Sequence, residues 1–320
     1  MFEGVPSYPD FSRFWQIIDK YKVNQFYTAP TAIRALAKQG VGYFKDCSLK
    51  SLKVLGTVGE PINEEAWQWY KLHVGKDSCP IVDTWWQTET GGVLISSIPK
   101  VISDKPTFAT KPFVGVQPIL LDDEGKELNK PNIVGKLCIK YPWPSIARTI
   151  WGNHQRYIDT YFSAFKNMYF TGDGAFKDKE GNFRITGRVD DVIIVSGHNL
   201  GTAPIEDAIN EHESIVESAI VGFPHEIKGN ALYGFITLKY NPENINHIKI
   251  EINSLISEKI GPIAKLDKIQ ITTGLPKTRS GKIMRRILRK IASNQTEDLG
   301  DISTLLNPDV VQEIIDNYQI

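Results

Sequence analysis

Two neighbouring stretches, LKVLGTVGEP at residues 52–61 and IVDTWWQTETGG at residues 81–92, decide the fold of this 320-residue chain. Each begins with a short apolar run typical of a buried strand and ends in a polar turn that contains glycine. Between them, NEEAWQWYKLHV at residues 63–74 has the apolar spacing of a helix. A strand–helix–strand succession predicts parallel strands, and ligands bind beyond the carboxyl ends of such strands. The turns at 56–61 and 84–92 are therefore the first candidates for a site.

The same alternation extends towards the amino terminus. Apolar residues at helical spacing predict a helix over residues 11–22, and VNQFYTA at 23–29 predicts a short strand before a second helix from about Thr31. Further along, PILLDDEGKEL at 118–128 and GKLCIK at 135–140 read as short strands with turn signals. These two segments favour an antiparallel, β-rich region.

A different succession follows TGDGAFKDKEGNFRITGRVDD at 171–191, in which residues 179–182 predict a hairpin turn. The elements expected after it are a strand at 192–195, a helix near 204–212, strands near 216–221 and 231–239, a helix near 246–259, a strand near 268–272 and a basic helix from about 283. This order suits a compact α+β domain of roughly 100 residues. We expect a large α/β domain over 1–189, a small domain over 190–292 and a polar surface tail over 293–320.

Composition excludes several classes of protein. Hydrophobic residues make up 41% and charged residues 23%, near the averages of soluble globular proteins. Lys plus Arg number 37 and Asp plus Glu number 37, so a nucleic-acid partner held by a global positive field is not expected. The three cysteines form no C-x-x-C pair, which argues against a disulfide framework or a zinc site and fits a reducing cytoplasm. We also expect neither a secretory signal nor a membrane-spanning segment.

Two loops carry groups that could do chemistry. TWWQTE at 84–89 combines two indoles with the hydroxyls of Thr84 and Thr88 and the carboxylate of Glu89, a set suited to a small apolar pocket beside a magnesium-bound phosphate. A plainer alternative is that one indole faces the core and the other the surface. Asp173, with glycine on both sides, could present its carboxylate to a ribose diol, or could fix a turn by bonding its own backbone.

The run LPKTRSGKIMRRILRK at 275–290 holds seven Lys and Arg residues. It is not a Walker A loop, because Pro276 and Ile283 stand where that motif needs glycine and serine or threonine. Lys282 follows a glycine and precedes a helix, so it could deliver a point charge to a transferring phosphoryl group. The remaining cations of the helix are expected to be solvated: Arg285, Arg286, Arg289 and Lys290.

Together, three separated motifs resemble those of the acyl-adenylate-forming superfamily. Their residues are most similar to those of the AMP-forming acetate–CoA ligases, the acetyl-CoA synthetases. They are DTWWQTETGG at 83–92, YFTGDGAFKDKEGNFRITGRVDDVIIVSGHNLGTAPIE at 169–206 and LPKTRSGKIMRRILRKIA at 275–292. Shorter segments, FYTAPTAIRAL, GPIA and DLGDISTL, extend the resemblance over essentially the whole chain. It implies that acetate and ATP, with Mg²⁺, give acetyl-adenylate and pyrophosphate, and that CoA then takes the acetyl group and releases AMP.

The resemblance also implies a nucleotide site. Its residues are Gly59, Glu60, Pro61, Asp83, Thr84, Trp85, Trp86, Gln87, Thr88, Asp173 and Arg188. In the family, the segment matching Gly59–Pro61 lines the adenine pocket, and the residue matching Asp173 binds the ribose hydroxyls. Trp86 would cap the acyl pocket and leave room for a methyl group but not for a long chain. Glu89 matches the magnesium carboxylate.

By the same resemblance, the small domain turns about Asp190 between the two half-reactions. Lys282 would reach the adenylation site in one orientation only, and it is the expected target of acetylation, which would make a deacetylase a partner. Ser196 and Gly197 would contact CoA in the other orientation. A structural cation is implied at three further positions: Asn210, His212 and Ile215.

Three positions depart from the family pattern. Asn199 stands where an arginine meets the AMP phosphate, so a charged hydrogen bond worth about 1.5–3 kcal/mol is missing. Pro204 replaces a glutamate at the start of a helix, where proline is tolerated. Ser257 replaces an arginine that contacts CoA. Each change weakens the expected binding of a ligand.

The family's Ser/Thr/Gly-rich phosphate loop should precede residue 1, so the chain corresponds to the carboxyl-terminal half of such an enzyme. The expected partners are acetate, ATP, CoA and an amino-terminal half, without nucleic acid or membrane. Two alternatives stay open. One is a remnant that folds and binds nucleotide or CoA without turnover, and the other is a propionate–CoA ligase.

Overall fold

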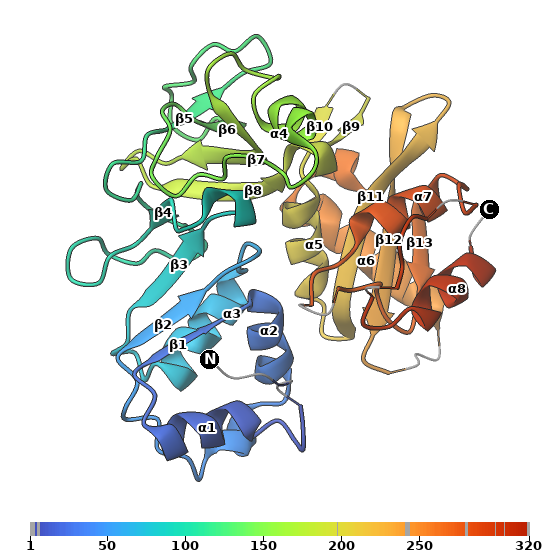
Figure 1. Ribbon diagram of the computed structural model, residues 1–320. Helices are drawn as coiled ribbons and strands as arrows, with labels where there is room; N and C mark the ends of the chain where they lie inside the picture. Colours follow the sequence, from blue (N-terminus) through green and yellow to red (C-terminus); the bar gives the residue numbers. More distant parts are fainter. Residues whose placement is uncertain are drawn as a thin grey trace. The chain divides into compact units, whose positions relative to one another are not determined.

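The computed structural model describes residues 4, 7–196, 198–240, 244–278, 281–297, 299–303 and 305–318. The chain divides into two compact units, Met1–Thr186 and Gly187–Ile320, which we call the amino-terminal and the carboxyl-terminal unit (Figure 1). The boundary expected after residue 189 falls near this division, on the short 3-10 turn η4 (Val189–Asp191).

A largely parallel sheet opens the amino-terminal unit. Its strands lie in the order β1 (Gln25–Thr28), β2 (Val54–Thr57), β3 (Ile81–Trp85) and β4 (Ile95–Ser96), of which the first three are parallel and the last is antiparallel to β3. The helix α1 (Arg13–Tyr21) precedes β1, α2 (Pro30–Lys38) lies between β1 and β2, and α3 (Glu64–Trp69) lies between β2 and β3. The strand–helix alternation predicted from the sequence is therefore confirmed, because only helical crossovers return the chain to a parallel strand.

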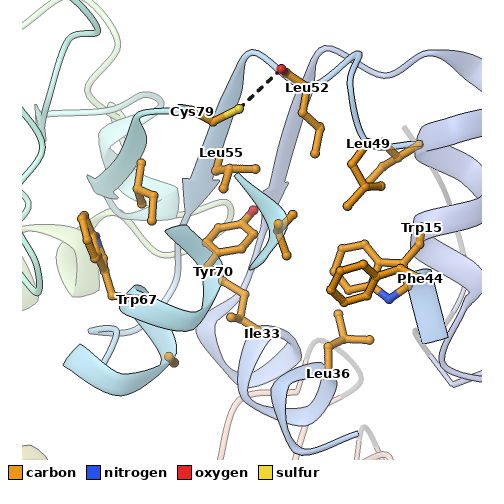
Figure 2. Packing of buried hydrophobic residues seen from close by; sticks show 14 of the residues in the cluster. Trp15, Ile33, Leu36, Phe44, Leu49, Leu52, Leu55, Trp67, Tyr70 and Cys79 are labelled. Atoms are coloured by element: carbon orange, nitrogen blue, oxygen red, sulfur yellow. Dashed lines mark hydrogen bonds between the residues drawn. The ribbon is translucent and has the colours of Figure 1, made fainter. Parts of the chain in front are cut away.

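Aliphatic and aromatic residues together fill the core beside this sheet (Figure 2). The rings of Trp15 and Phe44 lie 4.9 Å apart between centroids, and Tyr70 is fully buried and donates its hydroxyl to the carbonyl oxygen of Phe26 at 2.9 Å. Such large side chains bury the most apolar area per residue, so they dominate the stability of the layer. Cys79 contacts the carbonyl of Leu52, and all three cysteines of the chain are free thiols.

The predicted β-rich region forms a second, antiparallel sheet in the same unit. Its strands lie in the order β5 (Pro118–Leu121), β6 (Gly135–Ile139), β7 (Tyr169–Lys177) and β8 (Phe183–Arg188). The hairpin expected at 179–182 joins β7 to β8. The sequence did not indicate α4 (His154–Tyr161), which is mainly polar and begins where the side chain of Asn153 accepts a hydrogen bond from the Arg156 amide at 3.0 Å.

The carboxyl-terminal unit has one five-stranded sheet with helices on both faces (Figure 1). Its strands are β9 (Ile193–Val195), β10 (His198–Leu200), β11 (Ile215–His225), β12 (Gly229–Leu238) and β13 (Lys268–Ile271). Alternate side chains of β12 enter opposite cores: Leu232 and Ile236 pack with α5 (Thr202–Asn210) and α6 (Ile245–Lys259), whereas Tyr233 and Phe235 pack with α7 (Arg285–Ala292) and α8 (Asp309–Asp316). The predicted α+β succession is confirmed.

No helix of the described part of the chain could cross a membrane. The longest, α6, has 15 residues, fewer than the ~20 that a bilayer requires.

The segment 293–320, expected to be a polar surface tail, instead completes the second core of the carboxyl-terminal unit. Val311 and Ile314 on α8 are buried in it, and Gln270 of β13 donates to the carbonyl of Ile314 at 2.8 Å. The polar composition of the segment hid two apolar positions at helical spacing. Residues three apart on a helix lie on the same face, so Val311 and Ile314 give α8 an apolar face that can be buried.

We therefore expect Ile314→Ala to lower the free energy of unfolding by about 2–5 kcal/mol, because it leaves a cavity in a closed core. The exposed Leu306 (59% exposed) supplies the matched control, for which we expect a change within about 0.5 kcal/mol. Urea unfolding followed by far-UV circular dichroism measures both. Equal stability of the two variants would contradict the placement of α8.

Candidate functional site

The carboxyl ends of β1, β2 and β3 bring several polar side chains of the amino-terminal unit together. Tyr27 near the end of β1 and Thr84 near the end of β3 join their hydroxyls at 2.7 Å, and Thr84 donates to the carbonyl of Thr57 at 2.8 Å. The indole N–H of Trp86 donates to the Tyr27 hydroxyl at 3.2 Å. The two turns singled out from the sequence thus lie at the same edge of the sheet, as parallel strands require.

Asp83 is a buried carboxyl group in this edge rather than an exposed ligand. It lies opposite Thr57 in the strand register, and the Thr57 hydroxyl donates to it. Burial raises the pKa of Asp83 to about 7, and the hydrogen bond from Thr57 opposes this shift without cancelling it. The side chain of Asp83 therefore supports the strand ends from inside.

The side chain of Glu60 completes the start of α2. Its Oε1 accepts a hydrogen bond from the backbone amide of Thr31 at 2.7 Å and pairs with Arg34 at 2.9 Å. Pro30 opens the helix and Ala29 cannot cap it, so a carboxylate from the turn after β2 satisfies an amide that would otherwise lack a partner. The side chain of Glu60 thus holds the turn against α2. Any contact of Gly59–Pro61 with an adenine would be made by backbone atoms.

Trp85 and Gln87 both donate to the carboxylate of Asp173 on β7. The indole Nε1 of Trp85 and the amide Nε2 of Gln87 each lie 3.0 Å from Oδ2 of Asp173. Gln87 is itself oriented, since it donates to the carbonyl of Thr171 at 2.7 Å and accepts from the hydroxyl of Tyr169 at 2.9 Å. Burial raises the pKa of the Tyr169 hydroxyl, so this group stays protonated as a donor.

Asp173 does not lie in a turn, contrary to the plainer interpretation of TGDG. It lies in β7, where the pairing with β6 shifts register between Lys136 and Cys138. Gly172 has a φ of 71°, in the left-handed region that favours glycine. The irregularity is a β-bulge, a device that re-aims side chains and is common beside active sites. The glycine next to Asp173 therefore serves the strand and not a turn.

Glu89 follows in the same loop and is half-buried. The hydroxyl of Tyr161 on α4 donates to its Oε1 at 2.6 Å, and its carbonyl accepts from the amide of Ala147 at 2.8 Å. Thr88 beside it is exposed. Tyr161 stacks on Tyr169 with ring centroids 5.1 Å apart. Tyr161 therefore holds Glu89 directly, and Tyr169 acts on Asp173 only through Gln87.

In the carboxyl-terminal unit, Lys282 lies at the end of a hairpin loop and is exposed. Two hydrogen bonds join Thr278 and Lys282 across the loop. The amide of Thr278 donates to the carbonyl of Lys282 at 2.8 Å, and the amide of Lys282 donates to the side-chain hydroxyl of Thr278 at 3.1 Å. Lys277 at its base pairs with Glu217 at 2.6 Å. Ser280 lies outside the described residues. Lys282 is thus presented on a short loop anchored at its base.

The helix after Lys282 is held by two charged contacts. Arg285 makes two hydrogen bonds to the buried Glu206 of α5, the shorter at 2.6 Å, and Arg289 lies 2.6 Å from Asp191 and 3.1 Å from the carbonyl of Asp190. The sequence analysis expected both arginines to be solvated, so it missed their contacts with Glu206, Asp190 and Asp191. The sequence around Glu206 contains nothing that identifies Arg285, 79 residues later in the chain, as its partner.

The remaining predicted positions of this unit have structural contacts. Arg188 pairs with Asp190 at 3.0 Å, and the amide of Ser196 donates to the carbonyl of Lys228 at 3.1 Å. Gly197 lies outside the described residues. Asn210 accepts from Ser218 at 3.0 Å, and His212 lies 3.4 Å from Glu251.

For the implied cation at Asn210, His212 and Ile215, the backbone offers one relevant observation. The carbonyl of His212 already accepts the amide of Ile215 at 3.0 Å. Across the described ranges, no group of three or more His, Cys, Asp and Glu side chains could hold a metal ion.

Comparison with known proteins identifies the family. Residues 1–151 match the model described as "AMP-binding enzyme", and residues 204–282 match the model described as "AMP-binding enzyme C-terminal domain". The chain belongs to the AMP-binding enzyme family. The second model lies wholly within the carboxyl-terminal unit, and the first lies within the amino-terminal unit.

Curated relatives narrow the family. The chain is 59% identical over 318 residues to an acetyl-coenzyme A synthetase of Leptospira biflexa, 58% identical over 319 residues to one of Syntrophobacter fumaroxidans and 56% identical over 317 residues to acetyl-coenzyme A synthetase 2 of Pseudomonas aeruginosa. These matches cover 99–100% of the chain and 49% of each relative. The chain therefore spans about half the length of the relatives, and the resemblance seen in the sequence is confirmed.

A solved structure shares the fold. The anthranilate CoA ligase AuaEII in complex with anthranoyl-AMP matches with a TM-score of 0.78 and 27% identity, over 92% of this chain and 54% of that chain. The predicted fold class, part of an adenylate-forming domain followed by a small carboxyl-terminal domain, is confirmed by these matches.

The buried Asp83 gives a pH-dependent prediction. Its folded pKa of about 7 lies above the ordinary 3.8, so between these values the folded state keeps a proton that the unfolded state releases. Stability is therefore lost as the pH rises from about 4 to about 7. Asp83→Asn removes this titration. From pH 5 to pH 8 the free energy of unfolding of the wild type should therefore fall by about 3 kcal/mol relative to that of the variant.

Urea unfolding followed by tryptophan fluorescence measures this difference, because all seven tryptophans lie in the amino-terminal unit. Asp46→Asn, at an exposed position, is the matched control and should follow the wild type at both pH values. Parallel pH profiles of Asp83→Asn and the wild type would show that Asp83 ionises normally in the folded chain.

Proposed function

We propose that this chain is the carboxyl-terminal half of an AMP-forming acetate–CoA ligase, with acetate, ATP and CoA as substrates. The observation that carries the proposal is the carboxylate of Asp173, buried at a bulge and held by Trp85 and Gln87 from the loop after β3. A carboxylate with two fixed donors on one oxygen is preorganised to accept the paired hydroxyls of a ribose. The relatives over the whole chain supply the reaction.

The acyl group would lie beside Trp86. Its indole is 38% exposed, whereas that of the neighbouring Trp85 is 7% exposed and points into the core. A planar indole at the end of a pocket excludes longer acids, since each methylene changes discrimination by about 1–3 kcal/mol. Acetate is the natural substrate of such a short pocket. Propionate differs from it by one methylene and is the competing substrate.

Glu89 is the residue that would hold Mg²⁺. Its carboxylate is a hard oxygen donor, and Mg²⁺ is commonly bound by one or two carboxylates together with the phosphates of the substrate. Tyr161 bonds one oxygen of Glu89 at 2.6 Å and so fixes the orientation of the group. When bound, the ion would neutralise charge that develops on the phosphates.

Lys282 would supply a second positive charge in the adenylation step. Its exposed ammonium on an anchored loop can approach an anionic phosphate without first breaking a buried contact. Acetylation would remove that charge and so switch off adenylation. Turning of the carboxyl-terminal unit about Asp190 would then replace Lys282 by the segment of Ser196 and Gly197 for transfer to CoA.

The triphosphate also needs a cradle. The Ser/Thr/Gly-rich phosphate loop of the family has no counterpart in these 320 residues, and we propose that an amino-terminal half supplies it. Asn199 in place of the expected arginine weakens the contact with the AMP phosphate. That substitution is the feature which favours the alternative of a chain that binds nucleotide without turnover.

We expect Lys282→Ala to lower adenylation by at least ~10²–10³-fold, because one preorganised charge is lost where negative charge develops. Transfer from preformed acetyl-adenylate to CoA should change less than about threefold. The measurement uses a chimera in which this chain replaces the matching 318-residue region of the Leptospira biflexa relative. Acetate-dependent ATP–pyrophosphate exchange reports the first step, and CoA-dependent release of AMP reports the second.

Lys265→Ala is the matched control, since Lys265 is an exposed lysine of the same unit outside the hairpin loop. It should leave both steps unchanged. Equal loss of both half-reactions in Lys282→Ala would remove Lys282 from the adenylation step, and an unreactive wild-type chimera would favour the non-catalytic alternative.

A further inference from the structure

We infer that Tyr27 is a positioning residue that fixes the indole of Trp86 and thereby sets the length of acid accepted. The inference rests on the proposed function, in which Trp86 caps the acyl pocket. Tyr27 lies in FYTAPTAIRAL, a segment that carries the family resemblance, but the sequence analysis gave it no role. It lies near the carboxyl end of β1, which β2 separates from β3 and the loop that carries Trp86.

The ring of Tyr27 packs directly against the backbone of β2. Tyr27 lies opposite Gly56 in the register of β1 and β2, and a Cβ atom placed on Gly56 would come within 2.5 Å of the Tyr27 ring. Only glycine allows the ring to lie so close to the backbone of β2. The tyrosine ring is therefore fixed by a strand in the middle of the sheet.

The hydroxyl of Tyr27 is part of a directed chain of hydrogen bonds. Thr84 uses its single hydroxyl proton on the carbonyl of Thr57, so Tyr27 must be the donor in its 2.7 Å bond with Thr84. The oxygen of Tyr27 is then the acceptor for the indole N–H of Trp86 at 3.2 Å. The chain ends at a backbone carbonyl of β2, which ties the indole to the rigid sheet.

Packing alone does not hold Trp86. Tyr27 is 49% exposed and Trp86 38% exposed, so the indole has open space into which it could turn. Its orientation then depends on the one hydrogen bond from Nε1, which a tyrosine hydroxyl can accept and a phenylalanine cannot. Without that bond the indole samples other rotamers, and the pocket no longer excludes the next methylene sharply.

The test is Tyr27→Phe in the same chimera, with kcat/KM for acetate, propionate and butyrate measured by ATP–pyrophosphate exchange. We expect the preference for acetate over propionate to fall about 3- to 10-fold, as loss of one neutral hydrogen bond predicts. Tyr21→Phe, at an exposed tyrosine on α1, is the matched control and should keep the preference.

A double-mutant cycle with Trp86→Gly separates the inference from the proposed function. Trp86→Gly alone should open the pocket to longer acids, and adding Tyr27→Phe should then change the preference no further. If Trp86→Gly leaves chain-length preference unchanged, the proposed pocket is wrong. If Trp86→Gly changes the preference and Tyr27→Phe does not, only the role of Tyr27 is overturned.

The isolated 320-residue chain offers a readout that needs no activity. The indole ¹⁵N–¹H signal of Trp86, assigned by its absence in Trp86→Phe, should shift and exchange faster with water in Tyr27→Phe. An unchanged signal would show that the indole is held by something other than Tyr27.

Discussion

The amino-terminal unit depends on one buried carboxylate and the two donors that satisfy it. Asp173 belongs to the antiparallel sheet, whereas Trp85 and Gln87 belong to the end of the parallel one. A buried carboxylate is costly unless it is paired or hydrogen-bonded, so losing either donor while Asp173 stays buried would destabilise the unit. The hydrogen bonds that would orient the carboxylate towards a ribose therefore also link the two sheets, which share an apolar core containing Ile95 and Leu137.

Neighbouring tryptophans show how strand geometry divides roles between similar residues. Trp85 is the last residue of β3 and points into the core, whereas Trp86 lies just beyond the strand with much of its indole exposed. Successive residues of a strand face opposite sides, so two adjacent indoles cannot both be buried on one face. The plainer interpretation, one indole inside and one outside, is what the structure shows. It is also what the proposed pocket needs, because the inner indole holds Asp173 and the outer one is left for the acyl group.

Local periodicity was enough to predict most of the elements. The strand before GTVGEP, the strand before QTETGG and the helix between them all follow from residues close in sequence. What could not be predicted depends on contacts far apart in the chain. Nothing near Asp173 reveals the bulge, which arises only when β7 pairs with β6, and nothing near Glu89 points to Tyr161. The prediction of a surface tail over 293–320 was wrong for a different reason, since its apolar residues become informative only when the core beside them is known.

In the carboxyl-terminal unit, α7 limits where the chain can turn. Arg289 bonds both the carboxylate of Asp191 and the carbonyl of Asp190, and Arg285 bonds Glu206 on α5. Charged hydrogen bonds of this kind contribute about 1.5–3 kcal/mol each, so moving Asp191 relative to α7 is costly. In the proposed turning of the unit, rotation that spares these contacts would occur in backbone bonds at or before Asp190. The loop of Lys282 leads into α7 and would then turn together with that helix.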